Sequence, residues 1–183
     1  AHALATSSCM GALHLACLAL DLGPGGEVIV PAQTHVATVH AVEWVGARPV
    51  FADCDPQTGN VTADRIAAAL TPATKAIVVV HFAGIPCDMP PIVRLARERG
   101  LKIVEDCALA IGARWQGTHV GLFGDAGCFS FYPVKHFTTG EGGMLVTRDA
   151  EVAARVSRLR AFGVERDHGD GPPARTQIGR AHV

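Results

Sequence analysis

The stretch that decides the fold runs from Asp125 to Met144 and reads DAGCFSFYPVKHFTTGEGGM. Its apolar run, Ala126–Tyr132, holds one serine and ends at a proline, which is typical of a buried strand that gives way to a loop. A single lysine, Lys135, then stands between that strand and a glycine-rich turn. Because desolvation favours the neutral amine, a lysine placed there is a candidate nucleophile. On this stretch alone, a solvated loop lysine is an equally good interpretation.

Outside this stretch, apolar strands alternate with helical patterns. Strands are predicted at 27–31, 48–52, 75–81, 101–106 and 143–147, and helices at 8–22, 34–45, 62–70, 88–99 and 150–162. Several strands are apolar throughout, which indicates a parallel sheet covered by helices on both faces. We therefore predict an α/β fold, a three-layer α/β/α arrangement with a mostly parallel sheet. Ligands of such sheets lie beyond the carboxyl ends of the strands, where His81, Asp106 and Lys135 stand. For His81 we favour a satisfied core histidine.

Composition excludes several classes of function. The 183 residues are 49% hydrophobic, which suffices for one well-packed domain. A net charge of −1 and an aromatic content of 5% argue against a nucleic-acid surface. We find no signal peptide and no apolar run long enough to span a membrane. The six cysteines show no C-x-x-C pair and no metal-ligand spacing, so we predict no metal and a reducing cytoplasm.

Both ends of the sequence look cut. It begins without a methionine and enters a helical pattern almost at once. We expect residues 1–168 to form one domain and residues 169–183 to be a disordered tail. The last residues, 178–183, read IGRAHV and resemble a translated sequencing adapter, so we expect them to be non-native.

Three features together point to a cofactor. Asp106 ends a buried strand, Lys135 ends another, and the small-residue turn 6–11 opens a helix. A helix N-terminus binds phosphate, a buried carboxylate can hold a pyridinium proton, and a lysine can form a Schiff base. Pyridoxal 5′-phosphate needs all three groups, although Asp106 alone also reads as a helix N-cap. Nucleotide binding is disfavoured, because neither G-x-G-x-x-G after the first strand nor a P-loop is present.

Specific motifs extend this interpretation to a family. They are VPAQT (30–34), PVF (49–51), DPQTGN (55–60), VED (104–106), SFYPVK (130–135) and TGEGG (139–143). In these motifs the chain resembles the DegT/DnrJ/EryC1/StrS family of sugar aminotransferases, which are fold type I pyridoxal-phosphate enzymes. The resemblance runs from about Ser7 to Gly163. It implies the large, cofactor-binding domain of such an enzyme.

The resemblance also implies the catalytic pair. Lys135 would hold the cofactor as a Schiff base and then move the proton between the amino-bearing carbon and the cofactor. Asp106 would pair with the pyridine nitrogen and keep it protonated. Some relatives carry histidine at the lysine position and act as sugar dehydratases, so Lys135 favours transamination.

Further contacts follow from the same resemblance. Ser130 would donate to the phosphate, helped by the backbone N–H groups of Met10 and Gly11, and the ring of His35 would stack on the cofactor. The chain departs from the family pattern at Met10, where a threonine is usual. It departs again at Leu109, where glutamine or histidine is usual, and at Ala161, where asparagine is usual.

The implied reaction is transfer of an amino group from L-glutamate, or glutamine, to a keto-sugar nucleotide for a polysaccharide, glycan or antibiotic. Two subunits would build each site, which implies a homodimer through the active-site face. The N-terminal arm and C-terminal small domain of the family are missing, so we expect little turnover from these 183 residues alone. The alternatives are a pyridoxal-phosphate sugar dehydratase and a non-catalytic regulatory or binding relative, which Leu109 and Ala161 make conceivable.

Overall fold

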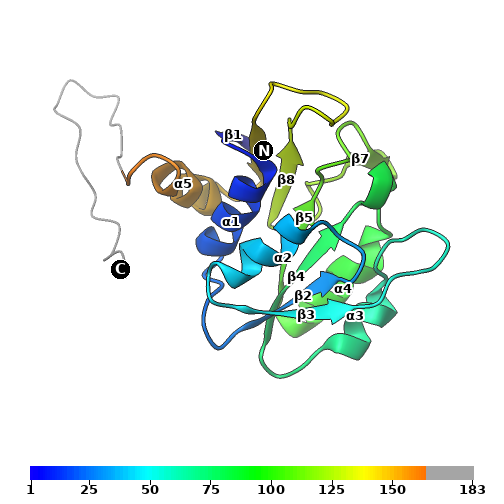
Figure 1. Ribbon diagram of the computed structural model, residues 1–183. Coiled ribbons are helices and arrows are strands. Elements are labelled where there is room, and N and C mark those ends of the chain that lie inside the picture. Colours follow the sequence, from blue (N-terminus) through cyan, green and yellow to red (C-terminus); the bar gives the residue numbers. More distant parts are fainter. Residues whose placement is uncertain (164–183) are drawn as a thin grey trace, which may run out of the picture.

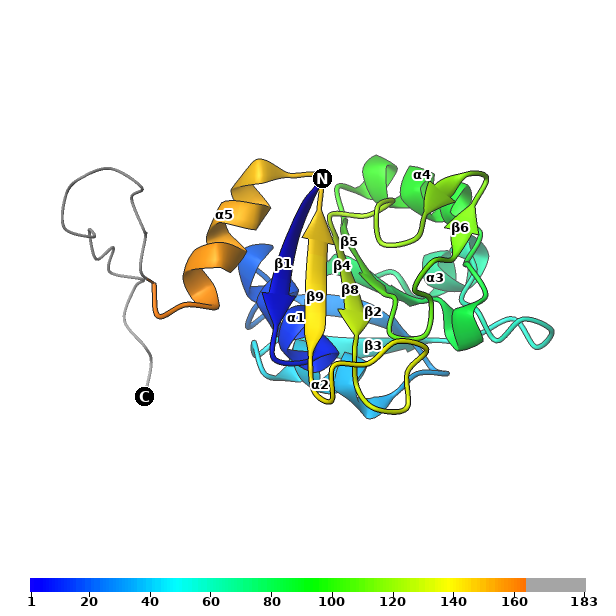
Figure 2. The same cartoon turned by 90° about the horizontal axis from the view of Figure 1, so that it is seen from above.

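One seven-stranded sheet organises residues 1–163, the part of the chain that the computed structural model describes. Its strands are β1 (His2–Thr6), β2 (Glu27–Pro31), β3 (Arg48–Ala52), β4 (Thr74–Val80), β5 (Lys102–Asp106), β8 (Ala126–Ser130) and β9 (Gly143–Thr147). They lie in the order β1-β9-β8-β5-β4-β2-β3. Figure 1 shows the sheet, and Figure 2 labels β9 between β1 and β8. The pairs β2–β3, β2–β4, β4–β5 and β5–β8 are parallel, whereas β9 runs antiparallel to both its neighbours. The mostly parallel sheet that the sequence predicted is confirmed.

Helices cover both faces of this sheet. They are α1 (Cys9–Ala19), α2 (Val36–Glu43), α3 (Ala63–Ala69), α4 (Met89–Arg99) and α5 (Ala150–Leu159). Helices α1, α2 and α5 lie on one face and α3 and α4 on the other, which Figure 2 shows from above. A short 3-10 turn, η1 (Phe82–Gly84), follows β4, and a small hairpin of β6 (Arg114–Trp115) and β7 (Thr118–His119) follows β5. The three-layer arrangement is therefore confirmed.

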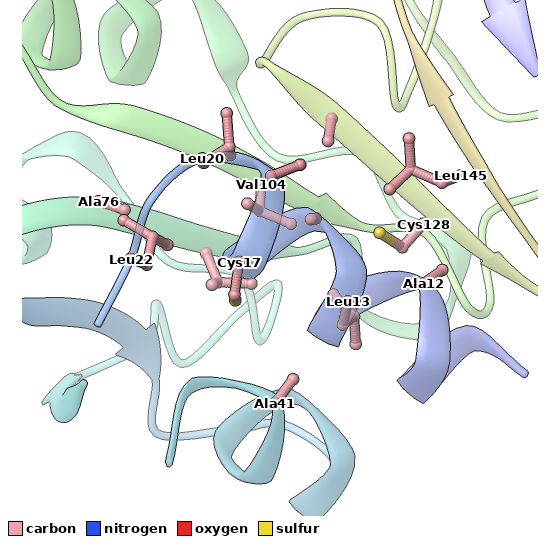
Figure 3. Packing of buried hydrophobic residues seen from close by; sticks show 14 of the residues in the cluster. Ala12, Leu13, Cys17, Leu20, Leu22, Ala41, Ala76, Val104, Cys128 and Leu145 are labelled. Carbon is pink, nitrogen blue, oxygen red and sulfur yellow. The ribbon is translucent and has the colours of Figure 1, made fainter. Parts of the chain in front are cut away.

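The larger of the cores lies between the sheet and α1. Leu13 of α1 packs in the same buried cluster as Val104 of β5 and Leu145 of β9, which Figure 3 shows from close by. On the other face, Ile66 and Ile92 of α3 and α4 are fully buried. Each such side chain contributes about 1.5–3 kcal/mol relative to its exposed state. Buried clusters on both faces therefore hold the sheet and its strand ends in place.

The structure corrects several element boundaries. Strand β1 was not predicted, because Leu4 is its one buried residue and the strand depends on antiparallel pairing with β9. Helix α2 has His35 as its N-cap instead of Thr34. Strand β8 ends at Ser130, two residues before the apolar run does. The tail expected at 169–183 lies outside the described residues.

No helix within residues 1–163 combines the length and the apolar character needed to cross a membrane.

Candidate active site

The strand ends place the predicted site residues on one edge. Strands β5 and β8 are parallel neighbours, with Asp106 paired to Cys128, so Asp106 and Ser130 end their strands on the same side. The loop 131–142 continues from β8 and carries Lys135. Figure 2 shows this loop, drawn in yellow, at the end of the sheet where α1 begins. Lys135, Asp106 and Ser130 are therefore brought to the end where parallel sheets bind ligands.

The Asp106 carboxylate is held by the chain but not fully occupied. Its Oδ2 accepts the Thr38 hydroxyl at 2.7 Å. Its Oδ1 accepts the Ala108 N–H at 3.0 Å and faces the Cys9 thiol at 4.0 Å. The contact with Ala108 closes a local turn, and the next regular element of the described chain is strand β6. Asp106 is therefore not the N-cap of a helix, which removes the structural alternative that the sequence left open.

The Cys9 thiol is subject to the charges of both Asp106 and Lys135. Burial raises the pKa of the Cys9 thiol well above its usual range. The charge of Asp106 raises that pKa further, whereas the charge of Lys135 lowers it. Lys135 is half-buried, while Val134 and His136 on either side are exposed. Lys135 is thus less exposed than its neighbours in the loop, and its role as the amine that holds a cofactor stays a prediction.

The start of α1 and Ser130 meet across Gly143. Ser130 and Gly143 are paired in adjacent strands. A Cβ at Gly143 would lie 2.3 Å from the carbonyl carbon of Ser8, so a glycine is needed where β9 passes the start of α1. Ser8 caps that helix, since its Oγ accepts the Gly11 N–H at 3.0 Å. Backbone donors and a serine hydroxyl consequently converge on one small region.

The donors available there differ in how free they are. No hydrogen bond joins the N–H groups of Cys9 and Met10 to another described residue. The Ser130 Oγ is buried and accepts the Tyr132 N–H at 3.4 Å, which leaves its own proton free to donate. The Gly11 N–H is already bound to the Ser8 hydroxyl. An anion at this point would therefore reach Met10 and Ser130 directly and would compete with Ser8 for Gly11.

His35 has a role that its sequence position did not reveal. Its Nδ1 accepts the Ala37 N–H at 3.1 Å, so the imidazole is the N-cap of α2. The side chain is exposed at the start of the helix that carries Thr38. Stacking on a cofactor ring stays a prediction for this residue.

A second acid–histidine cluster lies next to the site. His81, Glu105 and Cys107 are buried, and their ligand atoms lie within 4.8 Å of one another. The Cys87 N–H donates to His81 Nδ1 at 3.1 Å, so Nε2 carries the proton that bonds Glu105 Oε2 at 3.0 Å. Burial and the Glu105 and Asp106 charges raise the pKa of the Cys107 thiol, so it stays protonated. With its donors and acceptors committed internally, this cluster is structural, and the interpretation of His81 as a satisfied core histidine is confirmed.

The donor set fits pyridoxal phosphate. A helix N-terminus and the buried Ser130 hydroxyl provide an anion-binding end, and the Asp106 carboxylate provides an acceptor for a protonated ring nitrogen. Lys135 provides the amine. Sequence reasoning missed Thr38, whose hydroxyl bonds Asp106. The available signal was its place four residues after Thr34, which puts both side chains on one side of the helix start.

Comparisons with known proteins show the family of this chain. The model of the DegT/DnrJ/EryC1/StrS aminotransferase family matches residues 1–179, and the chain belongs to this family. It is 52% identical over 164 residues to a UDP-N-acetyl-3-dehydro-alpha-D-glucosamine 3-aminotransferase of Acidithiobacillus ferrooxidans. That match covers 89% of this chain and 44% of the relative.

A second curated relative and a solved structure are similarly close. The chain is 46% identical to a GDP-perosamine synthase of Caulobacter vibrioides, over 90% of this chain and 44% of the relative. An aminotransferase structure from Psychrobacter cryohalolentis superposes with a TM-score of 0.90 at 43% identity, covering 94% of this chain and 45% of that one. The chain thus spans somewhat less than half the length of the relatives that it matches.

Proposed function

We propose that this chain is the cofactor-binding large domain of a pyridoxal-phosphate aminotransferase that acts on nucleotide sugars. The observation that carries the proposal is that Asp106, Ser130 and the loop with Lys135 lie at one end of the parallel sheet, where the start of α1 meets Ser130 across Gly143. Family membership supports the reaction class. The chain departs from the family pattern at Met10, Leu109 and Ala161. It still has the amine of Lys135, the carboxylate of Asp106 and the hydroxyl of Ser130.

Each residue has a definite task in this proposal. Pyridoxal phosphate, when bound, supplies an aldehyde that condenses with amines and a ring that withdraws electrons. Lys135 Nζ would hold the cofactor through its aldehyde and, as a free amine, would carry the proton that transamination requires. Asp106 keeps a proton on the ring nitrogen. Ser130 and the N-terminus of α1 would bind the phosphate.

The substrates are proposed from the names of the relatives. One relative is named for a UDP-linked 3-dehydro sugar and another for GDP-perosamine. We infer a keto-sugar nucleotide as acceptor and L-glutamate, or glutamine, as donor. The product would be an amino sugar for a polysaccharide, glycan or antibiotic.

A homodimer through the active-site face is part of the proposal. Large apolar side chains are exposed in the loop that carries Lys135, and Val134 is 77% exposed. Others stand in the loops after β4 and β5. The set comprises Tyr132, Val134, Phe137, Ile85 and Ile111. Exposed apolar side chains gathered at one edge are typical of a protein interface, and a second subunit would cover them. We propose the cytoplasm as compartment, because all six cysteines are free thiols.

The half-reaction with glutamate tests the proposed activity. The enzyme at the length of its relatives is loaded with pyridoxal phosphate and mixed with L-glutamate, and 2-oxoglutarate and pyridoxamine phosphate are measured. We expect both products in equal amounts, and then an amino sugar when a keto-sugar nucleotide is added. The Lys135→Ala variant should form none of these products, whereas Lys102→Ala, which changes a lysine at the opposite end of β5, should match the wild type.

Two other outcomes decide between the remaining functions. Consumption of a nucleotide sugar with loss of water and no amine transfer would establish the dehydratase alternative. A loaded protein that reacts with neither glutamate nor glutamine would favour a regulatory or binding relative.

A further inference from the structure

A directional chain of hydroxyl groups ends on the Asp106 carboxylate. The Thr34 hydroxyl donates to Thr38 Oγ1 at 2.7 Å, and the Thr38 hydroxyl donates to Asp106 Oδ2 at 2.7 Å. Thr38 lies in the first turn of α2 and is 1% exposed. A threonine in a helix usually returns its hydroxyl to a backbone carbonyl of the preceding turn. Here the proton of Thr38 is committed to a side chain on another element.

The occupancy of Asp106 shows what this contact controls. An ionised carboxylate offers about four acceptor positions on its two oxygens. Oδ1 uses two of them, for the Ala108 N–H and the Cys9 thiol. Oδ2 uses one, for Thr38. Within the described chain the remaining acceptor position is therefore on Oδ2, the atom that Thr38 fixes.

We propose that Thr38 is a positioning residue for the cofactor, which orients Asp106 Oδ2 and keeps the shared proton on the ring nitrogen. The inference rests on the proposed function of this site. A hydrogen bond donated to a carboxylate stabilises its charged form. With the Thr38 donor in place, a proton between Asp106 and the ring lies on the ring. Thr34 supports this role, because its hydroxyl donates to the Thr38 oxygen while the Thr38 hydroxyl donates to Asp106.

The structure also separates this role from simple helix packing. Thr38 lies between the Thr34 hydroxyl and the Asp106 carboxylate. Its bond to Asp106 joins α2 to the end of β5, which lies 68 residues away in the sequence. Valine has nearly the same shape as threonine but no hydroxyl, so Thr38→Val removes the donor and keeps the volume. Serine keeps the donor and removes a methyl group. The two variants therefore test the hydroxyl and the packing independently.

The test is the nitrogen chemical shift of the bound cofactor. The chain is loaded with pyridoxal phosphate labelled with ¹⁵N in the ring, and the ring-nitrogen shift reports directly whether that atom is protonated. We expect the protonated shift in the wild type and in Thr38→Ser. In Thr38→Val the signal should move toward the unprotonated value, and in Thr34→Val it should move the same way by a smaller amount.

Each other result contradicts a defined part of the account. An unchanged ¹⁵N shift in a folded, loaded Thr38→Val chain would overturn the positioning role. If Thr38→Val does not fold, an unchanged shift in Thr34→Val would overturn the positioning role instead, because the hydroxyl chain would then have no effect on the protonation of the ring nitrogen. A loss of protonation in Thr38→Ser equal to that in Thr38→Val would assign the effect to packing. Failure of the wild-type chain to bind the labelled cofactor would overturn the proposed function and this inference with it.

Discussion

Glu105 and Asp106 follow one another on β5 and point to opposite faces of the sheet, because side chains alternate along a strand. Glu105 is fully buried beneath the loop 121–124, where its oxygens accept the N–H groups of Gly121, Phe123 and Gly124 at 2.7–2.8 Å. His81 provides a fourth donor. Asp106 faces α1 and α2 and retains an acceptor position.

The difference teaches how to separate a structural acid from a functional one. Burial does not distinguish them, since both carboxylates are buried. What distinguishes them is how their acceptors are filled. A carboxylate whose acceptor positions are all filled by its own chain fixes that chain. A carboxylate that is oriented by the chain and left one position short is suited to a ligand. Four experiments test this contrast.

The largest effect is expected at Lys135, on the Asp106 face. Replacing it with alanine removes both the amine that holds the cofactor and the proton-transferring base, so turnover should fall by at least about 1,000-fold. The free energy of unfolding of the cofactor-free chain should stay within about 0.5 kcal/mol, because Lys135 lies in a loop and is only half-buried. Steady-state rates and urea unfolding measure the two quantities. A large loss of stability would mean that this face is structural too.

Glu105→Gln, in contrast to Lys135→Ala, should lower the free energy of unfolding. The amide NH₂ would face backbone N–H groups that have lost their acceptor, which costs about 3 kcal/mol of unfolding free energy. Asp106→Asn is the matched control and should cost less than half as much, because the amide oxygen can keep the Thr38 hydrogen bond and Asp106 accepts one backbone N–H where Glu105 accepts three. Urea unfolding of the cofactor-free chain compares the two. Equal losses would remove the distinction between the two acids.

Ser130→Ala tests whether the Ser130 hydroxyl binds the phosphate of the cofactor. Loss of one hydrogen bond to a charged phosphate should weaken pyridoxal-phosphate binding about 10-fold. Ser157→Ala, the same change on the exposed surface of α5, should leave binding unaltered. Fluorescence titration of the two variants measures the affinities. Unaltered binding in Ser130→Ala would place the phosphate elsewhere.

The smallest effect on the free energy of unfolding is expected at a third carboxylate, that of Asp21. Asp21 is exposed and pairs with Arg155 of α5, and the Arg155 hydrogen bond lowers its pKa. Since the folded-state pKa is the lower one, this stabilisation is present above the unfolded pKa and is lost as pH falls through the folded pKa. Solvent screening limits it to a few tenths of a kcal/mol. Asp21→Asn should therefore be slightly less stable than wild type at pH 7 and equal to it at pH 2. A difference that persists at pH 2 would point to another cause.

Much of this fold could be predicted from the sequence. Strands such as 27–31 and 48–52 are marked by apolar runs between turn residues, and their bounds agree with β2 and β3. Strand β1 could not be predicted, because its pattern is weak and its stability comes from a partner far along the chain. The start of α2 was misplaced by one residue, because a histidine cap through Nδ1 has no strong sequence signal.

The site divides in the same way. Asp106 and Ser130 end their strands, and Lys135 lies in the loop that follows β8; sequence patterns locate such positions well. The hydroxyl relay from Thr34 through Thr38 could not be inferred, because it depends on how α2 docks against the end of β5. The contrast between Glu105 and Asp106 was hidden for the same reason. Both are acids in one VED motif, and only the tertiary contacts show which one the loop 121–124 occupies.

The most direct test of the central claim uses the three lysines of the chain as an internal comparison. Lys75 and Lys102 lie at the N-terminal ends of β4 and β5, where they line a surface hollow. Lys135 lies in the loop at the other end of the sheet, where β5 ends at Asp106. The chain is incubated with limiting pyridoxal phosphate, reduced with borohydride, digested and analysed by mass spectrometry. The account predicts that the reduced cofactor is attached to the peptide that carries Lys135. Attachment spread equally over the three lysines, or absent from Lys135, would contradict it.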